Sequence, residues 1–84
     1  MLEVIGKPIQ VCAHFRCGRI VPRWFVWQGR RYQVDEIRNR WVIREGVGRM
    51  YHFAVTVADR AEVYEVCLCS ETMGWRLGRI DVNG

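Results

Sequence analysis

Short apolar runs alternate with polar positions along most of the chain, and glycines or charged clusters separate one run from the next. The clearest case is Ile9–Arg16, where apolar side chains occupy every second position. A period of two is typical of a β-strand with one buried face. The best helical candidate, around Asp59–Glu65, is short and lies between two strand-like runs. The pattern therefore predicts an all-β protein.

We predict six strands, at about Ile9–Arg16, Arg19–Trp27, Arg30–Arg44, Met50–Val57, Glu62–Cys69 and Trp75–Val82. Mostly tight turns join them, which is typical of an antiparallel meander. One face of this sheet is apolar and no helix is expected to cover it. Curling into a small barrel, closed or half-open, buries that face and protects the sheet edges. We expect a single domain over residues 1–84.

Gln28-Gly29 is the best hairpin signal, because glycine readily supplies the positive φ that two-residue turns require. A turn at this point fixes the register of the strands on either side. The expected opposite pairs are Phe25 with Tyr32, Trp27 with Arg30, and Trp24 with Gln33.

The apolar positions of the third strand change parity between Val34 and Ile37, so we predict a bulge near Asp35-Glu36. Past it, one face should hold Ile37, Trp41 and Ile43, and the other Arg38, Arg40 and Arg44. A five-residue loop, Glu45–Arg49, would then pair Ile43 with Tyr51 and Trp41 with Phe53. The expected core comprises Val11, Phe15, Phe25, Trp27, Tyr32, Val34, Trp41, Phe53, Val55, Tyr64, Val66, Trp75 and Leu77.

The charge of the chain suggests one class of binding partner, nucleic acid. The chain carries 13 basic and 9 acidic residues, a net charge of +4, and all but one of the basic residues are arginines. Arginine presents a planar fork of donors that suits phosphates. Codon usage or a thermophilic lifestyle would produce the same bias, so composition leaves both readings open. The chain has no apolar run of membrane-spanning length and starts without a basic leader, so we expect a cytoplasmic protein that does not enter membranes.

The most specific binding hypothesis concerns the hairpin face opposite the core. Trp24 and Arg31 should lie there side by side, as in the stacking surfaces of proteins that bind single-stranded DNA or RNA. Arg38, Arg40 and Arg44 could follow the phosphates. Alternatively, Trp24 and Val26 form a contact with a protein partner or a second copy of the chain, and the arginines are solvated or paired with acids.

A metal site is the next candidate. Cys12 and His14 on one strand, and Cys67 and Cys69 on another, all fall on the outer side and would suit tetrahedral zinc if the strands were close. However, residues two apart on a strand lie about 7 Å apart. The pattern therefore favours cysteine as a small strand-compatible hydrophobe over cysteine as a metal ligand. We therefore expect no cofactor.

Catalytic motifs are missing from the sequence. Ser70 is the single serine, and no nucleophile elbow or phosphate-binding glycine loop is present. Cys67 and His52 could meet across the fourth and fifth strands, a pairing that arises by accident as readily as by function. These observations favour a binding module over an enzyme.

One sequence pattern spans nearly the whole chain: Lys7-Pro8-Ile9-x-Val11-x-Ala13-x-Phe15, Gly18-x-Ile20-x-Pro22, and Phe25-x-Trp27-x-Gly29-Arg30-x-Tyr32-x-Val34. Tyr64-Glu65 and Trp75-x-Leu77 continue it. The pattern resembles a family of small uncharacterised bacterial proteins found in clostridia and actinobacteria. The resemblance implies no activity, and the cysteines lie outside the pattern.

Overall fold

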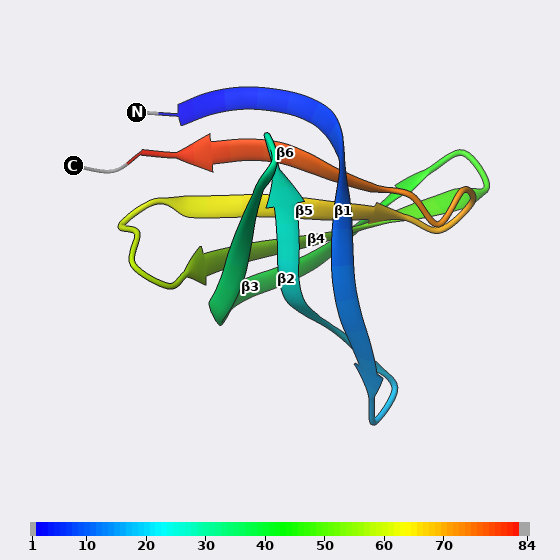
Figure 1. Ribbon diagram of the computed structural model, residues 1–84. Coiled ribbons are helices and arrows are strands. Elements are labelled where there is room, and N and C mark those ends of the chain that lie inside the picture. Colours follow the sequence, from blue (N-terminus) through cyan, green and yellow to red (C-terminus); the bar gives the residue numbers. More distant parts are fainter. Residues whose placement is uncertain (1, 83–84) are drawn as a thin grey trace.

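Six antiparallel strands follow one another in chain order and close into a ring (Figure 1). The computed structural model describes residues 2–82, apart from the side chain of Glu45. The strands are β1 (Leu2–Arg16), β2 (Arg19–Trp27), β3 (Arg30–Glu45), β4 (Gly48–Val57), β5 (Val63–Cys69) and β6 (Trp75–Asp81). Each pairs with the next, and β6 pairs with β1, which closes the barrel. The predicted all-β meander is thus confirmed. The described residues contain no helix that could span a membrane.

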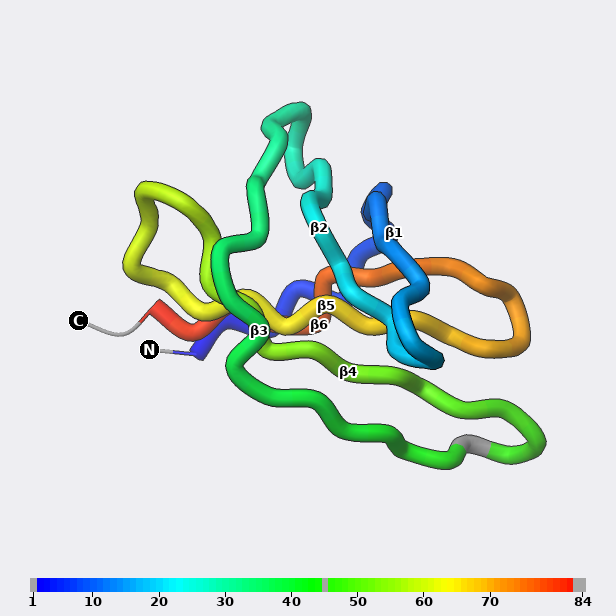
Figure 2. Tube along the Cα trace, turned by 90° about the horizontal axis from the view of Figure 1, so that it is seen from below, coloured from blue at the N-terminus to red at the C-terminus, as the bar shows by residue number. Residues whose placement is uncertain are grey.

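Two strands change partner along their length, and this divides the ring into two sheets. Residues Leu2–Ile9 of β1 pair with β6, whereas Gln10–Arg16 pair with β2. Likewise, β3 pairs with β2 over Arg30–Gln33 and with β4 from Val34 onward. We call the sheet around β4, β5 and β6 sheet A, and the sheet around β2 sheet B. The strands of sheet B cross those of sheet A steeply (Figures 1 and 2).

A backbone irregularity lies where β3 changes sheet, and another lies in β1 shortly before its change of sheet, within the half that pairs with β6. In β1 the register shifts between Val4 and Lys7, around a glycine, Gly6, with φ of 63°. In β3 it shifts between Val34 and Glu36, which confirms the predicted bulge near Asp35-Glu36. Bulges of this kind bend a strand and increase its twist, so both strands can turn from one sheet into the other. The first strand also begins earlier than predicted.

The hairpin between β2 and β3 has the predicted register. Gln28 and Gly29 both adopt positive φ, 52° and 73°, as a tight two-residue turn requires. The observed pairs Phe25 with Tyr32, Trp27 with Arg30, and Trp24 with Gln33 all match the prediction.

The connection between β3 and β4 is shorter than predicted. Glu45 pairs with Gly48, so two residues form the turn in place of five. A second register shift, between Ile37 and Asn39, was not predicted. Because side chains alternate faces along a strand, these two changes alter which side each residue occupies. The pairs Ile43 with Tyr51 and Trp41 with Phe53 are therefore wrong; the observed pairs are Ile43 with Met50 and Trp41 with His52.

The core lies between the two sheets and is built on aromatic contacts. Phe25 stacks on Tyr32 with ring centroids 5.1 Å apart, and Tyr64 contacts both rings. Six predicted core residues are buried, namely Phe25, Phe53, Val55, Tyr64, Val66 and Leu77. Five more pack against them while partly buried, namely Val11, Trp27, Tyr32, Val34 and Trp75.

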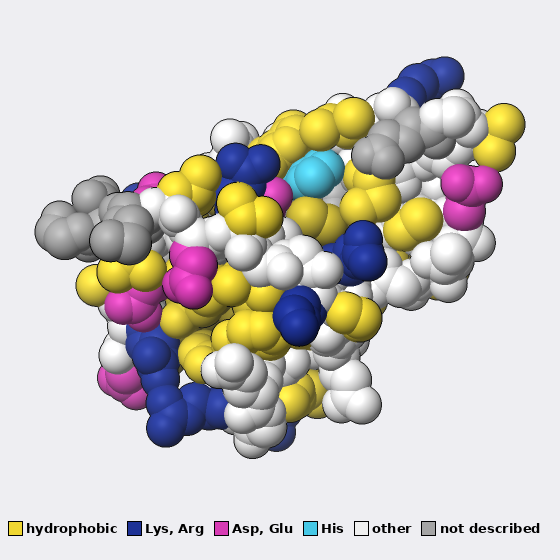
Figure 3. Space-filling model, turned by 90° about the horizontal axis from the view of Figure 1, so that it is seen from above, with side chains coloured by type: hydrophobic (Ala, Val, Ile, Leu, Met, Phe, Trp, Pro, Cys, Tyr) yellow, Lys and Arg dark blue, Asp and Glu magenta, His cyan; other side chains and the backbone are white. Residues whose placement is uncertain are grey.

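Two core predictions are wrong. Phe15 is 71% exposed, because it lies at the far end of the β1–β2 hairpin. Trp41 shares the outer face with His52, because the second bulge of β3 changes its side. Hydrophobic side chains also reach the surface elsewhere, between charged ones, as Figure 3 shows for one face.

Candidate functional site

The outer face of sheet B brings together the predicted stacking pair. The middle strand, β2, places Trp24 between Cys12 of β1 and Gln33 of β3. Arg31, opposite Val26, lies on the same face. The alternation that buries Phe25 and Tyr32 in the core therefore turns their sequence neighbours outward.

Arg31 and Trp24 form a cation–π contact. The guanidinium carbon lies 3.9 Å from the indole ring centroid. Trp24 is partly buried and Arg31 is exposed. The planar guanidinium thus covers the indole and presents its own opposite side to the solvent. We call this pair the Trp24–Arg31 stack.

The segment that carries this stack is basic and contains no acid. The segment Gln10–Val34, which forms nearly all of sheet B, contains five arginines and no aspartate or glutamate. All five are exposed, namely Arg16, Arg19, Arg23, Arg30 and Arg31. The other segments hold eight basic and nine acidic residues, so sheet B carries the entire net positive charge. A count of charge by segment would have found this signal in the sequence.

The three arginines Arg38, Arg40 and Arg44 do not form one outer surface. Arg38 lies at the second bulge of β3, and its Nε is 3.7 Å from a carboxylate oxygen of Glu36. Arg44 is exposed opposite Arg49, near the β3–β4 turn. Arg40 pairs with Phe53 on the inner side of its strand.

Arg40 joins two hairpins. Its guanidinium donates a hydrogen bond to the backbone carbonyl of Ile20 and lies over the ring of Phe53, 5.6 Å from the centroid. Burial, with a smaller contribution from Arg19, lowers the pKa of Arg40. An apolar groove of about 210 Å³ lies beside it, between the β1–β2 turn and strands β3 and β4. Arg40 therefore has a structural position rather than a place on an open surface.

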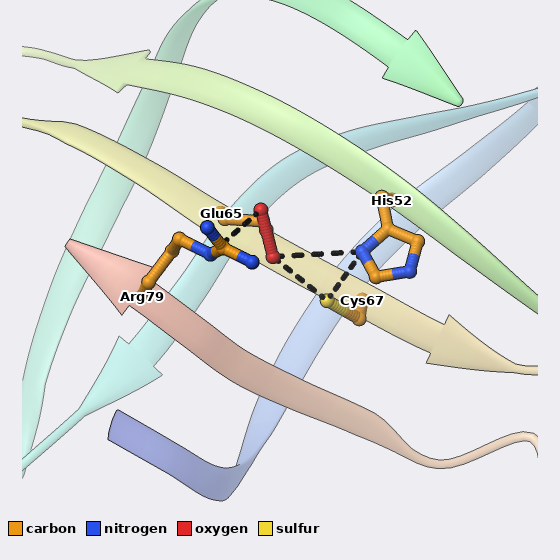
Figure 4. A network of polar contacts seen from close by, with 4 residues as sticks. All are labelled: His52, Glu65, Cys67 and Arg79. Carbon is orange, nitrogen blue, oxygen red and sulfur yellow. Dashed lines mark hydrogen bonds and ion pairs between the residues drawn. The ribbon is translucent and has the colours of Figure 1, made fainter. Parts of the chain in front are cut away.

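The predicted Cys/His set is also divided. Cys67 lies directly across from His52 on β4, as the sequence suggested, and Glu65 of β5 completes a group of three (Figure 4). Of the predicted set, Cys12, His14 and Cys69 do not belong to this group within the described chain. Glu65 was missed, although its position two residues before Cys67 on one strand places both on the same face. We call His52, Glu65 and Cys67 the β4–β5 cluster.

Three short distances define the β4–β5 cluster. Cys67 Sγ lies 3.2 Å from His52 Nδ1 and 3.8 Å from Glu65 Oε2, and Nδ1 lies 3.5 Å from the same carboxylate oxygen. Glu65 Oε1 is 3.3 Å from Arg79 Nε. Trp41 stacks on the His52 ring, with centroids 5.1 Å apart and an angle of 7° between the ring planes. These neighbours hold the imidazole and the carboxylate in fixed orientations.

The Cys67 thiol is unlike an activated nucleophile. Burial, followed by the nearby Glu65 carboxylate, raises the pKa of Cys67 to about 12. The thiol is therefore protonated at neutral pH, whereas catalytic cysteines have lowered pKa values. In addition, His52 presents the same nitrogen to Cys67 and Glu65, whereas a catalytic triad uses one imidazole nitrogen for each partner.

Comparison with known proteins gives one finding about identity. Residues 1–81 match the family described as Domain of unknown function (DUF6504). No curated protein and no solved structure shows a significant match. This match confirms the expectation that the chain belongs to an uncharacterised family. The matched span includes the β1 and β6 residues whose pairing closes the barrel. The chain therefore belongs to the DUF6504 family of domains of unknown function.

Proposed function

We propose that this domain is a non-enzymatic module that binds single-stranded nucleic acid on the outer face of sheet B. The observation that carries the proposal is the Trp24–Arg31 stack at the centre of a sheet with five exposed arginines and no acid. A basic surface attracts phosphates, and aromatic or guanidinium planes accept bases.

The chemistry of the face suits a strand with unpaired bases. A base stacks on the exposed side of Arg31, backed by the indole of Trp24, while the other exposed arginines contact phosphates. Base stacking on such a group contributes about 1–3 kcal/mol and does not depend strongly on sequence. Bases paired inside a duplex offer no free face, so double-stranded nucleic acid should bind more weakly.

The absence of an activated nucleophile in the β4–β5 cluster supports a binding role. Its one thiol is buried and protonated at neutral pH. Binding through sheet B requires no reaction at this cluster, which lies on the other sheet.

Fluorescence anisotropy with labelled oligothymidylate and oligouridylate tests the proposal. Affinity should fall steeply with added salt, because each phosphate contact contributes about 0.7 to the logarithmic slope. Trp24→Ala should weaken binding by about 5–150-fold, the equivalent of one stacked base. Arg31→Ala should weaken binding to a similar extent, because it removes the plane on which the base stacks.

Arg76→Ala is the matched control, because it removes one exposed arginine from sheet A. It should change affinity much less than Arg31→Ala. Absence of binding at low salt, or equal losses in both variants, would refute a site on sheet B. If sedimentation instead shows a dimer that Trp24→Ala makes monomeric, the Trp24–Val26 face is a subunit interface and the proposal is wrong.

A further inference from the structure

We propose that His52, Glu65 and Cys67 bind one divalent metal ion of the zinc class. Three different donor atoms converge on one point on the outer side of sheet A, and all lie within 4.8 Å of one another (Figure 4). Neutral imidazole, carboxylate and thiolate are the three ligand types that zinc uses in proteins.

The distances between donor atoms agree with tetrahedral coordination. Zinc bonds of about 2.0–2.3 Å at tetrahedral angles place neighbouring ligand atoms roughly 3.4–3.6 Å apart. The three observed separations are 3.2, 3.5 and 3.8 Å. A metal ion can therefore enter with side-chain shifts of a few tenths of an ångström, and the backbone need not move.

Hydrogen bonds alone do not explain why these three side chains converge. His52 Nδ1 faces both Cys67 Sγ and Glu65 Oε2, yet one imidazole nitrogen can either donate one hydrogen or accept one. An ion at the centre of the three atoms would interact with all of them at once. Cys67 and Glu65 are buried, and buried charged or polar groups are usually paired or bound to metal.

The neighbouring strand leaves room at this point. Gly78 of β6 has no positive φ, so its backbone does not require glycine. A methyl group there would lie 2.9 Å from Glu65 Oε2 and 3.3 Å from Cys67 Sγ. Gly78 thus keeps free the space beside two of the three donor atoms, independently of the donors themselves.

The donor set selects the metal and leaves one position open. A thiolate disfavours Mg²⁺ and Ca²⁺, which prefer oxygen ligands, and favours Zn²⁺ or Co²⁺. Three protein ligands fill three corners of a tetrahedron, so water or an added anion would occupy the fourth. Arg79 pairs with Glu65, and Trp41 stacks on His52. Both would orient these ligands without binding the metal themselves.

Titration of the reduced protein with Co²⁺ tests the site. We expect one equivalent to produce a thiolate-to-cobalt charge-transfer band and the intense visible bands of tetrahedral Co²⁺, and Zn²⁺ to remove both. Cys67→Ser should abolish the charge-transfer band. Cys69→Ser is the matched control, because it lies two residues further along β5, outside the cluster, and should behave as wild type.

Two further variants keep the test decisive if Cys67→Ser fails to fold. Gly78→Ala and Glu65→Gln should each weaken Co²⁺ binding by at least about 10–100-fold while far-ultraviolet circular dichroism stays unchanged. If wild type gives no charge-transfer band at stoichiometric Co²⁺, or if Cys69→Ser loses the band and Cys67→Ser retains it, the cluster is only a hydrogen-bonded network. Neither result would bear on nucleic-acid binding by sheet B.

Discussion

The two sheets share a core but differ sharply in the charged residues that they expose. Sheet B has five exposed arginines, a Trp–Arg stack and no acid over Gln10–Val34. All nine acids lie in the other segments, and one of them, Glu65 of sheet A, lies beside a histidine and a cysteine. The surface that we propose for nucleic acid and the metal site that we propose therefore lie on different sheets.

The difference in charge begins where β3 changes sheet. Asp35, the first acid after the arginine-rich segment, lies at the bulge where β3 leaves β2 and joins β4. In β1, Glu3 belongs to the half that pairs with β6. Sequence composition therefore changes within single strands, at their bends. The charge of each segment indicates the surface on which it lies, because each long strand contributes residues to both sheets.

The largest expected effect tests whether the sheets are one cooperative unit. Phe25 of sheet B and Leu77 of sheet A are both fully buried in the same cluster. Phe25→Ala should lower the free energy of unfolding by about 3–5 kcal/mol, and Leu77→Ala by about 2–5 kcal/mol. Urea denaturation followed by tryptophan fluorescence and by circular dichroism should give one coincident transition in each variant.

A loss of this size approaches the total stability of a small domain, about 5–15 kcal/mol. Phe25→Leu is therefore the milder companion variant and should remain folded. If Phe25→Ala unfolded sheet B alone, the two probes would separate into two transitions. The sheets would then be independent, and the comparison between them would concern two separate units.

The next effect concerns the burial of polar groups on sheet A. The pKa of Cys67 is raised from 9.0 to about 12, so above pH 9 the unfolded chain loses this proton before the folded protein does. Stability should therefore be complete below about pH 9 and decline as pH rises toward 12, by an amount on the order of a few kcal/mol.

Urea midpoints measured over this pH range, without added metal, check the expectation. Cys67→Ala removes the titrating thiol, so the decline with pH should be smaller in the variant than in wild type. Other groups, including Tyr64, whose pKa burial raises to about 12, contribute equally to both proteins. Parallel curves for the two proteins would show that Cys67 is less buried than the structure indicates.

The smallest effect separates two arginines that lie close together in β3. Arg40 donates to the Ile20 carbonyl between hairpins, so Arg40→Ala should cost about 1.5–3 kcal/mol of stability. Arg38 forms an exposed ion pair with Glu36, so Arg38→Ala should cost less than about 1 kcal/mol. Thermal denaturation measures both. Equal losses would mean that Arg40 contributes no more than a surface charge, and the division of roles in β3 would be lost.

The features that were predictable from sequence are those fixed by local chemistry. Gln28-Gly29 determined the β2–β3 register, and the parity change after Val34 indicated the first bulge. An uncovered apolar face, with no helix in the pattern, required a closed sheet. The stacking pair followed from that register, because Trp24 and Arg31 lie on the same side of a known hairpin.

The second bulge was not predictable in the same way. Ile37, Trp41 and Ile43 read as one apolar face in a regular strand, and a five-residue loop preserved that reading. A shift of one residue reverses every later side chain, so one missed bulge moved Trp41 outward and Arg40 inward. The β4–β5 cluster needed two pieces of information, the pairing of His52 with Cys67 and the alternation that adds Glu65, and only the first was considered.

The pairing of β6 with β1 has a consequence for the order of events in folding. Leu2 lies opposite Asp81, so the last contacts of the ring join residues separated by nearly the whole chain. Such long-range pairing carries a large loop-closure entropy and slows folding relative to local hairpins. A circular permutant that links these neighbouring ends and opens at the β3–β4 turn would make this closure local. The β3–β4 pairing would then become the long-range step, so the permutant should form the same barrel with β6 pairing to β1 early and β3 pairing to β4 last.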